Sequence, residues 1–380
     1  MKLNVLIMCS RGYGKTYSAV NAKSEYVAHG LQQAGCDVHI LDSVRGVTGV
    51  NQCVEQISPA GINYVTFPQV RHHNILPNLI LYKDLLIKYR QANKLNHIIM
   101  GMEYMPIFIY LANCARRMGY TTSTLLHEWH IGIQTKGILK SVHKYWQDLF
   151  FGYHVDAILP ISHFLLQKSA RFSKPTMLLP VLGRFDKRST AKIENRFTYC
   201  ADAGYLLRNQ LILHAFKMLC EVHVNARLVL VLFGTKNDLE AVNHCLRNLN
   251  INEYVAVLSQ IPQGELEDIY ASSLGLLIPL NPDSKQDIAR FSQKIAEYLA
   301  SGRPIITSSV GEVPYYFENE KNAMITEYSA HAYAEAMKYL MDNQERATMI
   351  GRSGYVTGVT YFDYVENGVR LREFLCANEL

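Results

Sequence analysis

The chain contains two successions of apolar strand, turn and helix, which constrain its fold more than any other feature. The first is an apolar run at 3–8, a glycine-bearing turn at 11–16 and, after a helix, a second strand at 37–41. The other begins at 197–200, and its next strand, 228–235, is a continuous apolar run, as in parallel strands buried on both faces. We therefore predict an α/β protein built from Rossmann-like βαβ units.

The length of the chain predicts two domains, because 380 residues exceed what one hydrophobic core usually serves. A polar, charged stretch without apolar periodicity at 183–192 is the natural boundary between them. We expect an amino-terminal domain at 1–183, a linker at 184–195 and a carboxyl-terminal domain at 196–355. The remaining residues, 356–380, include a stretch with helical spacing.

The composition is that of a globular protein with a mild positive charge. Hydrophobic residues make up 49% and charged residues 19%, and the net charge is +5 with Lys and Arg scattered along the chain. This charge does not by itself indicate a nucleic-acid partner, but it is compatible with phosphorylated substrates or anionic lipid. No apolar run reaches the roughly 18 residues that a membrane span needs, so any membrane contact must be peripheral.

The start of the chain and its cysteines indicate an expected location. The apolar start at 1–8 lacks a small-residue cleavage site and is better interpreted as the first strand than as a signal peptide. The eight cysteines show neither CxxC nor Cys/His ligand spacing and have the pattern of reduced thiols. We expect a cytoplasmic protein that can lie peripherally on the inner face of the membrane.

The glycine-bearing turn allows two functional interpretations and one structural alternative. A P-loop requires a glycine where Cys9 stands, so the residues 14–16 form an incomplete Walker motif. A dinucleotide fingerprint requires a third glycine where Tyr17 stands, and Asp42 after the second strand would then bind a ribose. A tight turn without a ligand is the structural alternative.

Two further strands are expected to end in polar loops. The strand at 121–126 ends in the sequence HEWH, whose two histidines and glutamate are too close together for the helical HExxH arrangement that binds zinc. We therefore predict no metal site there. The strand at 96–101 is followed by Glu103, in the loop where open α/β sheets bind ligands.

The helix expected at 75–90 is amphipathic and basic. Tyr82 and Leu86 share one face, and Lys83 and Lys88 project on others. Such a helix can lie on a membrane surface, although a solvated face on a helix that covers a sheet explains the pattern better.

The most informative motif is FSQKIAEYLASGRPIITSSVGEVP at 291–314. It predicts a helix that is entered from a polar loop, ended by Gly302 and Pro304 and followed by a short strand. The free N–H groups at the start of such a helix suit phosphate oxygens. The stretch resembles the donor-nucleotide motif of the retaining, GT-B-fold glycosyltransferases of group 1, and the order of elements after it resembles the rest of that domain.

This resemblance implies a fold and an activity. The fold would be GT-B, in which two Rossmann-like βαβ domains face a central cleft and a terminal helix, here within 356–380, packs back on the amino domain. The activity would be transfer of a hexose, with retention, from a nucleotide-diphosphate sugar to a hydroxyl of a glycan or lipid-linked acceptor in cell-surface polysaccharide synthesis. The chain has no Asp-x-Asp motif, which fits a metal-independent reaction. The sugar nucleotide is then a substrate, no cofactor is expected, and the partners would be donor, acceptor and anionic membrane but no nucleic acid.

The same resemblance assigns residues to the reaction. His127, Arg208 and Lys294 would act on the donor sugar and its diphosphate as catalytic residues. Glu103 and Glu128 would lie on the acceptor side. The residues implied in donor binding are Gly14, Gln260, Ile261, Phe291, Ser292, Gln293 and Glu297.

Two departures from the family pattern keep other functions open. Glu297 would accept hydrogen bonds from the ribose hydroxyls, but the first of the two glutamates of the family motif is replaced by Ala289, with Asp287 nearby. The turn that usually supplies two cations for the diphosphate contains only Arg208. One alternative is a glycosyltransferase-like binding or scaffold protein without catalysis. Another is a Rossmann nucleotide-dependent enzyme, an oxidoreductase or ATPase, built on the glycine-bearing turn.

Overall fold

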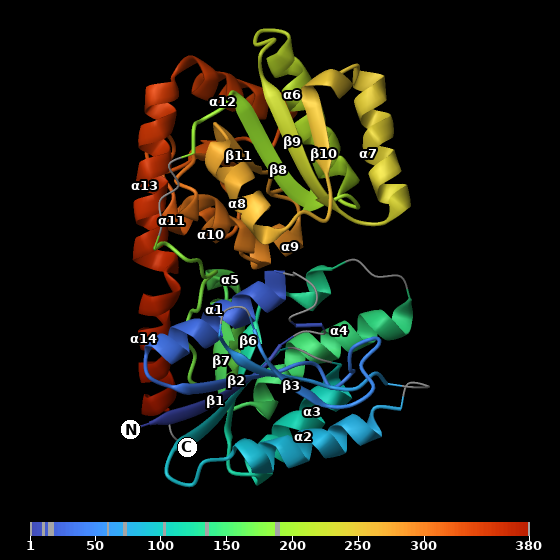
Figure 1. Cartoon of the computed structure of the whole chain (residues 1–380), viewed down its shortest axis with the longest axis vertical. Helices are drawn as coiled ribbons and strands as arrows, with labels where there is room; N and C mark the ends of the chain where they lie inside the picture. The colour runs from blue at the N-terminus through green and yellow to red at the C-terminus, as the bar shows by residue number, and fades with distance from the viewer. Residues whose placement is uncertain are drawn as a thin grey trace. The chain divides into compact units, whose positions relative to one another are not determined.

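The structure is a computed structural model that describes most of the chain. The described residues are 2–9, 12–13, 19–58, 61–70, 74–101, 104–133, 137–186 and 191–378. They fall into two compact units (Figure 1). Unit 1 comprises Met1–Leu182, Ala289–Gln293 and Asp363–Leu380, and unit 2 comprises Gly183–Ile288 and Lys294–Phe362. The expected limits of the two domains and of their linker stay predictions.

Unit 1 is built on a sheet of seven described strands in the order β3-β4-β2-β1-β5-β6-β7. The strands are β1 (Leu3–Met8), β2 (Asp37–Leu41), β3 (Val54–Ile57), β4 (Asn63–Thr66), β5 (Leu95–Met100), β6 (Thr121–Leu126) and β7 (Ala157–Pro160). Neighbouring strands are parallel except β3 and β4. All residues of β1 are buried, and the order of the strands reverses beside it. Ligands of open α/β sheets bind beyond the carboxyl ends of the strands at such a reversal.

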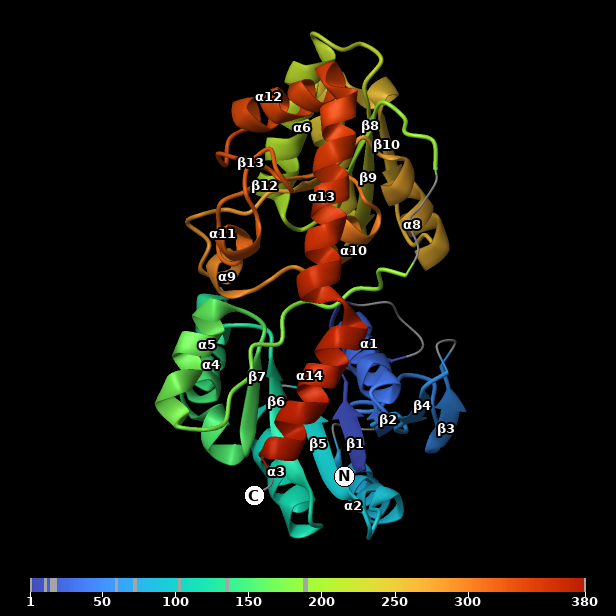
Figure 2. The same ribbon diagram turned by 90° about the vertical axis from the view of Figure 1, so that its left-hand side faces the viewer.

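Helices cover the sheet of unit 1 (Figures 1 and 2). They are α1 (Ala19–Gln33), α2 (Leu76–Tyr89), α3 (Met105–Arg117), α4 (Ile138–Phe150), α5 (His163–Ser169) and α14 (Tyr364–Ala377), with the short 3-10 turns η1 (His130–Gly132), η2 (Phe151–His154) and η3 (Ala170–Phe172).

Helices α1 and α14 lie side by side (Figure 2) with their backbones in direct contact. A Cβ atom added to Gly30 would lie 2.2 Å from the carbonyl oxygen of Tyr364, and one added to Gly368 would lie 2.2 Å from the carbonyl carbon of Gly30. Only glycine permits this approach, and it fixes the last helix of the chain against the first.

Unit 2 contains a parallel sheet whose described strands run in the order β10-β9-β8-β11-β12-β13. The strands are β8 (Arg196–Asp202), β9 (Arg227–Phe233), β10 (Val255–Leu258), β11 (Gly275–Ile278), β12 (Ile305–Ser308) and β13 (Met324–Thr326). The helices are α6 (Leu206–Cys220), α7 (Lys236–Leu249), α8 (Gln263–Ser272), α9 (Lys285–Ala289), α10 (Gln293–Ala300), α11 (Val313–Tyr316), α12 (Ala330–Asp342) and α13 (Gln344–Phe362), with the 3-10 turn η4 (Asn252–Tyr254). The last residue of α9 and the first residue of α10 belong to unit 1.

The predicted α/β class with Rossmann-like units is confirmed. The apolar run at 228–235 forms β9, whose interior residues are buried as the sequence predicts for a strand covered on both faces. Strand β8 lies in the middle of its sheet, and the strand order reverses beside it, as it does beside β1 in unit 1. The ligand-binding edge of unit 2 is therefore expected at the carboxyl end of β8.

No helix within the described ranges is long and apolar enough to cross a lipid bilayer. All eight cysteines lie in those ranges, and none of them is in a disulfide.

Candidate functional site

Helix α10 brings predicted donor residues close to β8 in unit 2. The hydroxyl of Tyr298 in α10 accepts a hydrogen bond from the Cys200 N–H of β8 at 3.2 Å. Lys294 and Glu297 lie one turn apart and are partly exposed, whereas the two residues between them are buried. Burial raises the pKa of the Cys200 thiol. The nearby Lys294 lowers this pKa and the nearby Glu297 raises it, so both side chains lie close to Cys200. The predicted cation and carboxylate therefore share the side of α10 that lies near the central strand.

The three residues before Lys294 belong to unit 1. Phe291 is buried, and Ser292 is partly exposed. The side-chain amide of Gln293 donates through Nε2 to the Leu182 carbonyl at 2.5 Å, while its Oε1 is buried without a hydrogen-bond partner among the described residues. Gln293 therefore supports the local fold, and the roles of these residues in donor binding stay predictions.

Arg208, the predicted catalytic cation of α6, is paired with Asp287. Its Nη2 lies 2.7 Å from Oδ2 of Asp287, both side chains are largely buried, and its guanidinium lies 4.6 Å from the centre of the Tyr205 ring. Asp287 Oδ2 also accepts the Asn281 N–H at 3.0 Å. Ala289, at the position of the missing family glutamate, is fully buried. The structure thus places Asp287 beside the predicted phosphate cation, a pairing that residues so far apart in sequence do not reveal.

The two residues implied in contacts with the nucleotide base follow β10. Gln260 is exposed and Ile261 partly exposed. Gln260 has a φ of 55°, in the left-handed region that residues with a side chain seldom adopt. Such conformations occur preferentially in ligand-binding loops, although their role here stays a prediction.

In unit 1, His127 follows β6 and lies near a buried lysine that the sequence analysis missed. Burial, with the nearby Lys23, holds the pKa of His127 well below its ordinary value, so the imidazole is neutral. Its Nε2 is buried without a hydrogen-bond partner in the described part of the chain. Lys23 is buried, its Nζ donates to the Leu179 carbonyl at 2.9 Å, and burial lowers its pKa to about 7. Its spacing to Val27 and Leu31 on one helical face of α1 is the signal that could have identified it.

The rest of the HEWH turn is held by α4. The Nδ1 of His130 and the Ile131 N–H bond to the buried carboxylate of Asp148, at 2.8 and 2.6 Å. Glu128, predicted on the acceptor side, is partly exposed. Among the described residues, no group of three or more His, Cys, Asp or Glu side chains is placed to hold a metal ion. His130 therefore has a structural partner in Asp148.

The glycine-bearing turn is fixed by Asp42. The buried carboxylate of Asp42 accepts the Gly12 N–H at 3.0 Å and the Ser43 N–H at 2.7 Å, both at Oδ1. The Asp42 carboxylate thus holds the backbone of the turn. These hydrogen bonds compete with those that it would accept from the ribose in a dinucleotide site. Gly14 and Glu103 lie outside the described residues, so their predicted roles have no structural description.

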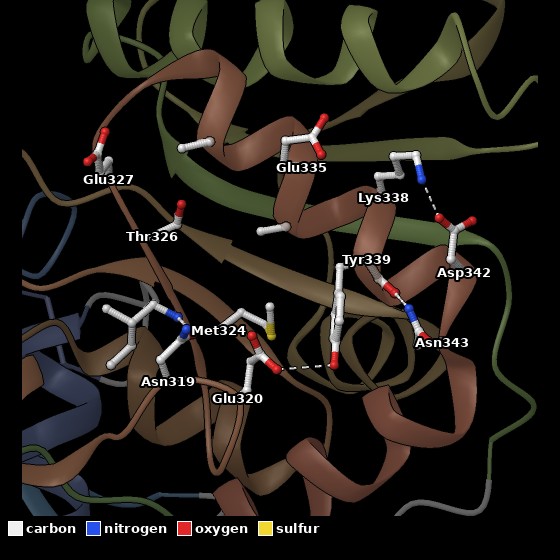
Figure 3. A pocket seen from close by; sticks show the side chains of 13 residues that line it. Asn319, Glu320, Met324, Thr326, Glu327, Glu335, Lys338, Tyr339, Asp342 and Asn343 are labelled. Atoms are coloured by element: carbon white, nitrogen blue, oxygen red, sulfur yellow. Dashed lines mark hydrogen bonds and ion pairs between the residues drawn. The ribbon is translucent and has the colours of Figure 1, made fainter.

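A separate hollow of about 560 Å³ lies beside β13 and α12 in unit 2 (Figure 3). Several of its polar side chains bind one another: the Tyr339 hydroxyl donates a hydrogen bond to Glu320 at 3.2 Å, and Lys338 forms an ion pair with Asp342 at 2.5 Å. Glu327 and Glu335 add negative charge. None of the described residues predicted for the site lines this hollow, and its acidic lining does not suit a diphosphate.

Both units have the Rossmann-like architecture of the GT-B class, and the comparisons with known proteins agree. Residues 189–357 match the family model of glycosyl transferases group 1. The fold is shared with sucrose-phosphate synthase from Thermosynechococcus elongatus, at a TM-score of 0.75 and 13% identity over 98% of both chains. It is also shared with Anabaena Alr3699/HepE in complex with UDP-glucose, at a TM-score of 0.75 and 11% identity over 98% of this chain and 99% of that one.

A curated relative, D-inositol 3-phosphate glycosyltransferase of Corynebacterium glutamicum (strain R), is 26% identical over 119 residues. The alignment covers 31% of this chain and only 27% of the relative. The chain thus has the GT-B fold, and its residues 189–357 are similar to glycosyl transferases group 1.

Proposed function

We propose that the protein transfers a hexose from a nucleotide-diphosphate sugar to a hydroxyl group of a glycan or lipid-linked acceptor, with retention and without metal or cofactor. The family match of residues 189–357 supports the reaction class. The observation that supports it most is the arrangement of Lys294 and Glu297, one turn apart on the side of α10 near β8. A cation for phosphate and a carboxylate for ribose hydroxyls are the two groups that a nucleotide diphosphate requires.

The reaction mainly requires stabilisation of the leaving diphosphate. The bond between the anomeric carbon and the diphosphate breaks, a bond to the acceptor oxygen forms, and the acceptor hydroxyl loses its proton. Negative charge therefore develops on the diphosphate, where positioned cations and N–H donors are most effective. We assign Lys294 and the N–H groups of the first turn of α10 to this role. Arg208 would join them from α6 if it exchanges part of its contact with Asp287 for phosphate oxygen.

We assign His127 to the donor sugar as a neutral hydrogen-bonding group. Its lowered pKa keeps the imidazole uncharged, so it can donate from one ring nitrogen and accept at the other. The buried, unpartnered Nε2 supports this assignment, because buried polar atoms normally have a partner and a sugar hydroxyl would supply one.

We propose uridine diphosphate sugars as the first donors to test, since the HepE structure holds UDP-glucose. We further propose that the acceptor belongs to cell-surface polysaccharide synthesis and that the protein contacts the inner face of an anionic membrane peripherally. The net charge of +5 supports such a contact.

A second candidate function is a binding protein that retains the donor site without turnover. The burial of Ala289 in place of the family glutamate and the engagement of Arg208 by Asp287 favour it. This protein would bind the sugar nucleotide but leave it intact.

Thermal unfolding in the presence of a ligand panel tests the proposal. We expect one nucleotide diphosphate and its sugar to raise the midpoint, because a ligand that binds only the folded state stabilises it. Incubation of the sugar nucleotide with lipid-linked and glycan acceptors, followed by assay of released nucleoside diphosphate, then separates transfer from binding. Protection by ATP or a nicotinamide dinucleotide, with none from nucleotide diphosphate sugars, would contradict both candidates.

A further inference from the structure

Helix α4 exposes its apolar side chains and buries polar ones. Its apolar face is Ile138, Leu139, Val142, Tyr145, Trp146 and Leu149. All six are exposed, from 38% for Trp146 to 86% for Leu139. At the angular step of a helix they fall within an arc of about 120°. The buried residues of α4 are instead Gln147 and Asp148. A helix of a globular protein normally buries its apolar stripe, so this face is built to contact something outside unit 1.

The polar side of α4 fixes the helix in this orientation. Asp148 is bonded to His130 and to the Ile131 N–H, in the turn that follows β6. Nε2 of His143 accepts the Met105 N–H at 3.1 Å, at the start of the helix that follows β5. These contacts hold α4 at the carboxyl ends of β5 and β6, the edge of the sheet where ligands bind. Rotation of α4 to bury its apolar face would break all of them.

The charges and aromatic rings of α4 favour a lipid surface as the partner. Its charged residues are Lys140, Lys144 and Asp148, and the carboxylate is buried, so its exposed charge is positive. Burial, with the nearby His130 and Arg45, lowers the pKa of His143. Arg45 is exposed and adds a further cation near α4. Tyr145 and Trp146 are of the residue types that concentrate at the boundary between lipid headgroups and hydrocarbon.

We propose that the α4 apolar face inserts into the headgroup region of an anionic lipid bilayer and that Lys140 and Arg45 bind the headgroup phosphates. An exposed apolar face that bears Trp and Leu, on a helix whose exposed charges are basic, is the pattern of a helix that lies in the membrane interface. The inference deepens the proposed function and rests on it for one point, the identity of the acceptor. A docked α4 places the ligand-binding edge of unit 1 at the bilayer surface, where the hydroxyl of a lipid-linked acceptor would be presented.

Helix α2, the basic amphipathic helix expected at 75–90, is the natural comparison. It exposes Leu76, Ile80 and Ile87, but it also buries Tyr82 and Leu86 against the fold. Its apolar residues are thus divided between the protein and solvent, as in a helix that covers a sheet. This distribution agrees with the solvated-face interpretation and leaves α4 as the docking element.

Vesicle sedimentation tests the proposal on the full chain. The vesicles are phosphatidylcholine alone or mixed with phosphatidylglycerol, and no donor or acceptor is added. We expect the protein to sediment with the anionic vesicles, less so at high salt because screening weakens the headgroup contacts. The paired substitution Ile138→Ser with Leu139→Ser should weaken binding about tenfold or more, since two largely exposed apolar side chains lose their burial in lipid. The matched control, Ile80→Ser on α2, should leave binding unchanged.

The fluorescence of Trp146 provides a second test in a protein whose α4 is unchanged. This test does not depend on whether the α4 variant folds correctly. In a Trp129→Phe background, Trp146 is the one remaining tryptophan. Its emission should shift to the blue with anionic vesicles and be quenched by brominated lipid. Absence of the shift and of sedimentation would overturn the proposal. A dimer in sedimentation velocity that Ile138→Ser with Leu139→Ser dissociates, without vesicle binding, would assign the face to a second copy of the chain.

The results on vesicle binding can be distinguished from the results on donor binding. The paired α4 variant should keep the thermal protection by nucleotide diphosphates that the native protein shows. If the native protein binds vesicles but no nucleotide diphosphate, the proposed function is contradicted and the proposed docking surface is still supported.

Discussion

Replacement of the buried Lys23 by methionine should stabilise unit 1 at low pH. Burial lowers the pKa of Lys23 from 10.5 to about 7. At about 1.4 kcal/mol per pKa unit, this shift corresponds to about 5 kcal/mol of unfavourable burial when the amine is protonated in both states. Methionine removes that cost but leaves the Leu179 carbonyl without its donor, a loss of about 1–3 kcal/mol. We expect a net gain of about 2–4 kcal/mol in the free energy of unfolding at about pH 6.

The pH dependence gives the sharper test. Between the folded pKa of about 7 and the unfolded value of 10.5, the unfolded state binds more protons at Lys23, so the native protein gains stability from this group as the pH rises. The advantage of the Lys23→Met variant should therefore shrink by about 3 kcal/mol between about pH 6 and pH 9.5.

Urea unfolding followed by tryptophan fluorescence is the assay, because Trp129 and Trp146 both lie in unit 1. Lys83→Met on the exposed side of α2 is the control and should show no such pH dependence. A stability difference between Lys23→Met and the native protein that stays constant with pH would refute the assigned pKa and its cause.

Three further predictions follow from particular contacts. Asp287→Ala leaves Arg208 without its carboxylate partner and should destabilise unit 2 by about 3–5 kcal/mol, measured by hydrogen exchange in β8 and α6. The control is Asp283→Ala, at an exposed position. A destabilisation by Asp287→Ala no larger than that by Asp283→Ala would contradict the buried ion pair. Gly30→Ala places a Cβ 2.2 Å from the Tyr364 carbonyl and should cost about 1–3 kcal/mol in the same fluorescence assay. Gly264→Ala, with open space around its Cβ in α8 of unit 2, should be neutral or stabilising when followed by hydrogen exchange in α8. An unchanged stability of unit 1 in Gly30→Ala would show that α1 and α14 do not pack so closely. Because His127 is already neutral, donor binding should not fall as the pH is lowered through the ordinary histidine range near 6.5; a loss there that His127→Asn abolishes would contradict the lowered pKa.

The sequence predicted the fold where a pattern repeats along the chain. The apolar runs at 3–8 and 228–235 became buried strands β1 and β9, and the motif at 291–314 gave α10 and β12. The antiparallel strand β3 was missed because it is short and mostly exposed, so it lacks the apolar alternation that marks a strand.

The site was less predictable, because its contacts join distant parts of the chain. Arg208 was singled out, but its partner Asp287 lies far along the sequence in a separate helix, and no local spacing connects them. Lys23 interrupts the apolar face of α1, and this interruption is the local sequence signal for its burial. The apolar pattern of α4 could be read from the sequence, whereas its exposure could not, because periodicity does not say which face of a helix is covered.

The most direct test of donor binding by α10 is the affinity of Glu297→Gln for a nucleotide diphosphate, measured by titration calorimetry. Uridine diphosphate is the first ligand to test, and Glu345→Gln, at an exposed position in α13, is the control. We predict that Glu297→Gln binds at least about tenfold more weakly, because charge-assisted hydrogen bonds to ribose hydroxyls contribute about 1.5–3 kcal/mol. Glu345→Gln should bind as the native protein does. Equal affinity of the native and Glu297→Gln proteins for the nucleotide that binds would contradict the assignment of α10 as the donor-binding helix.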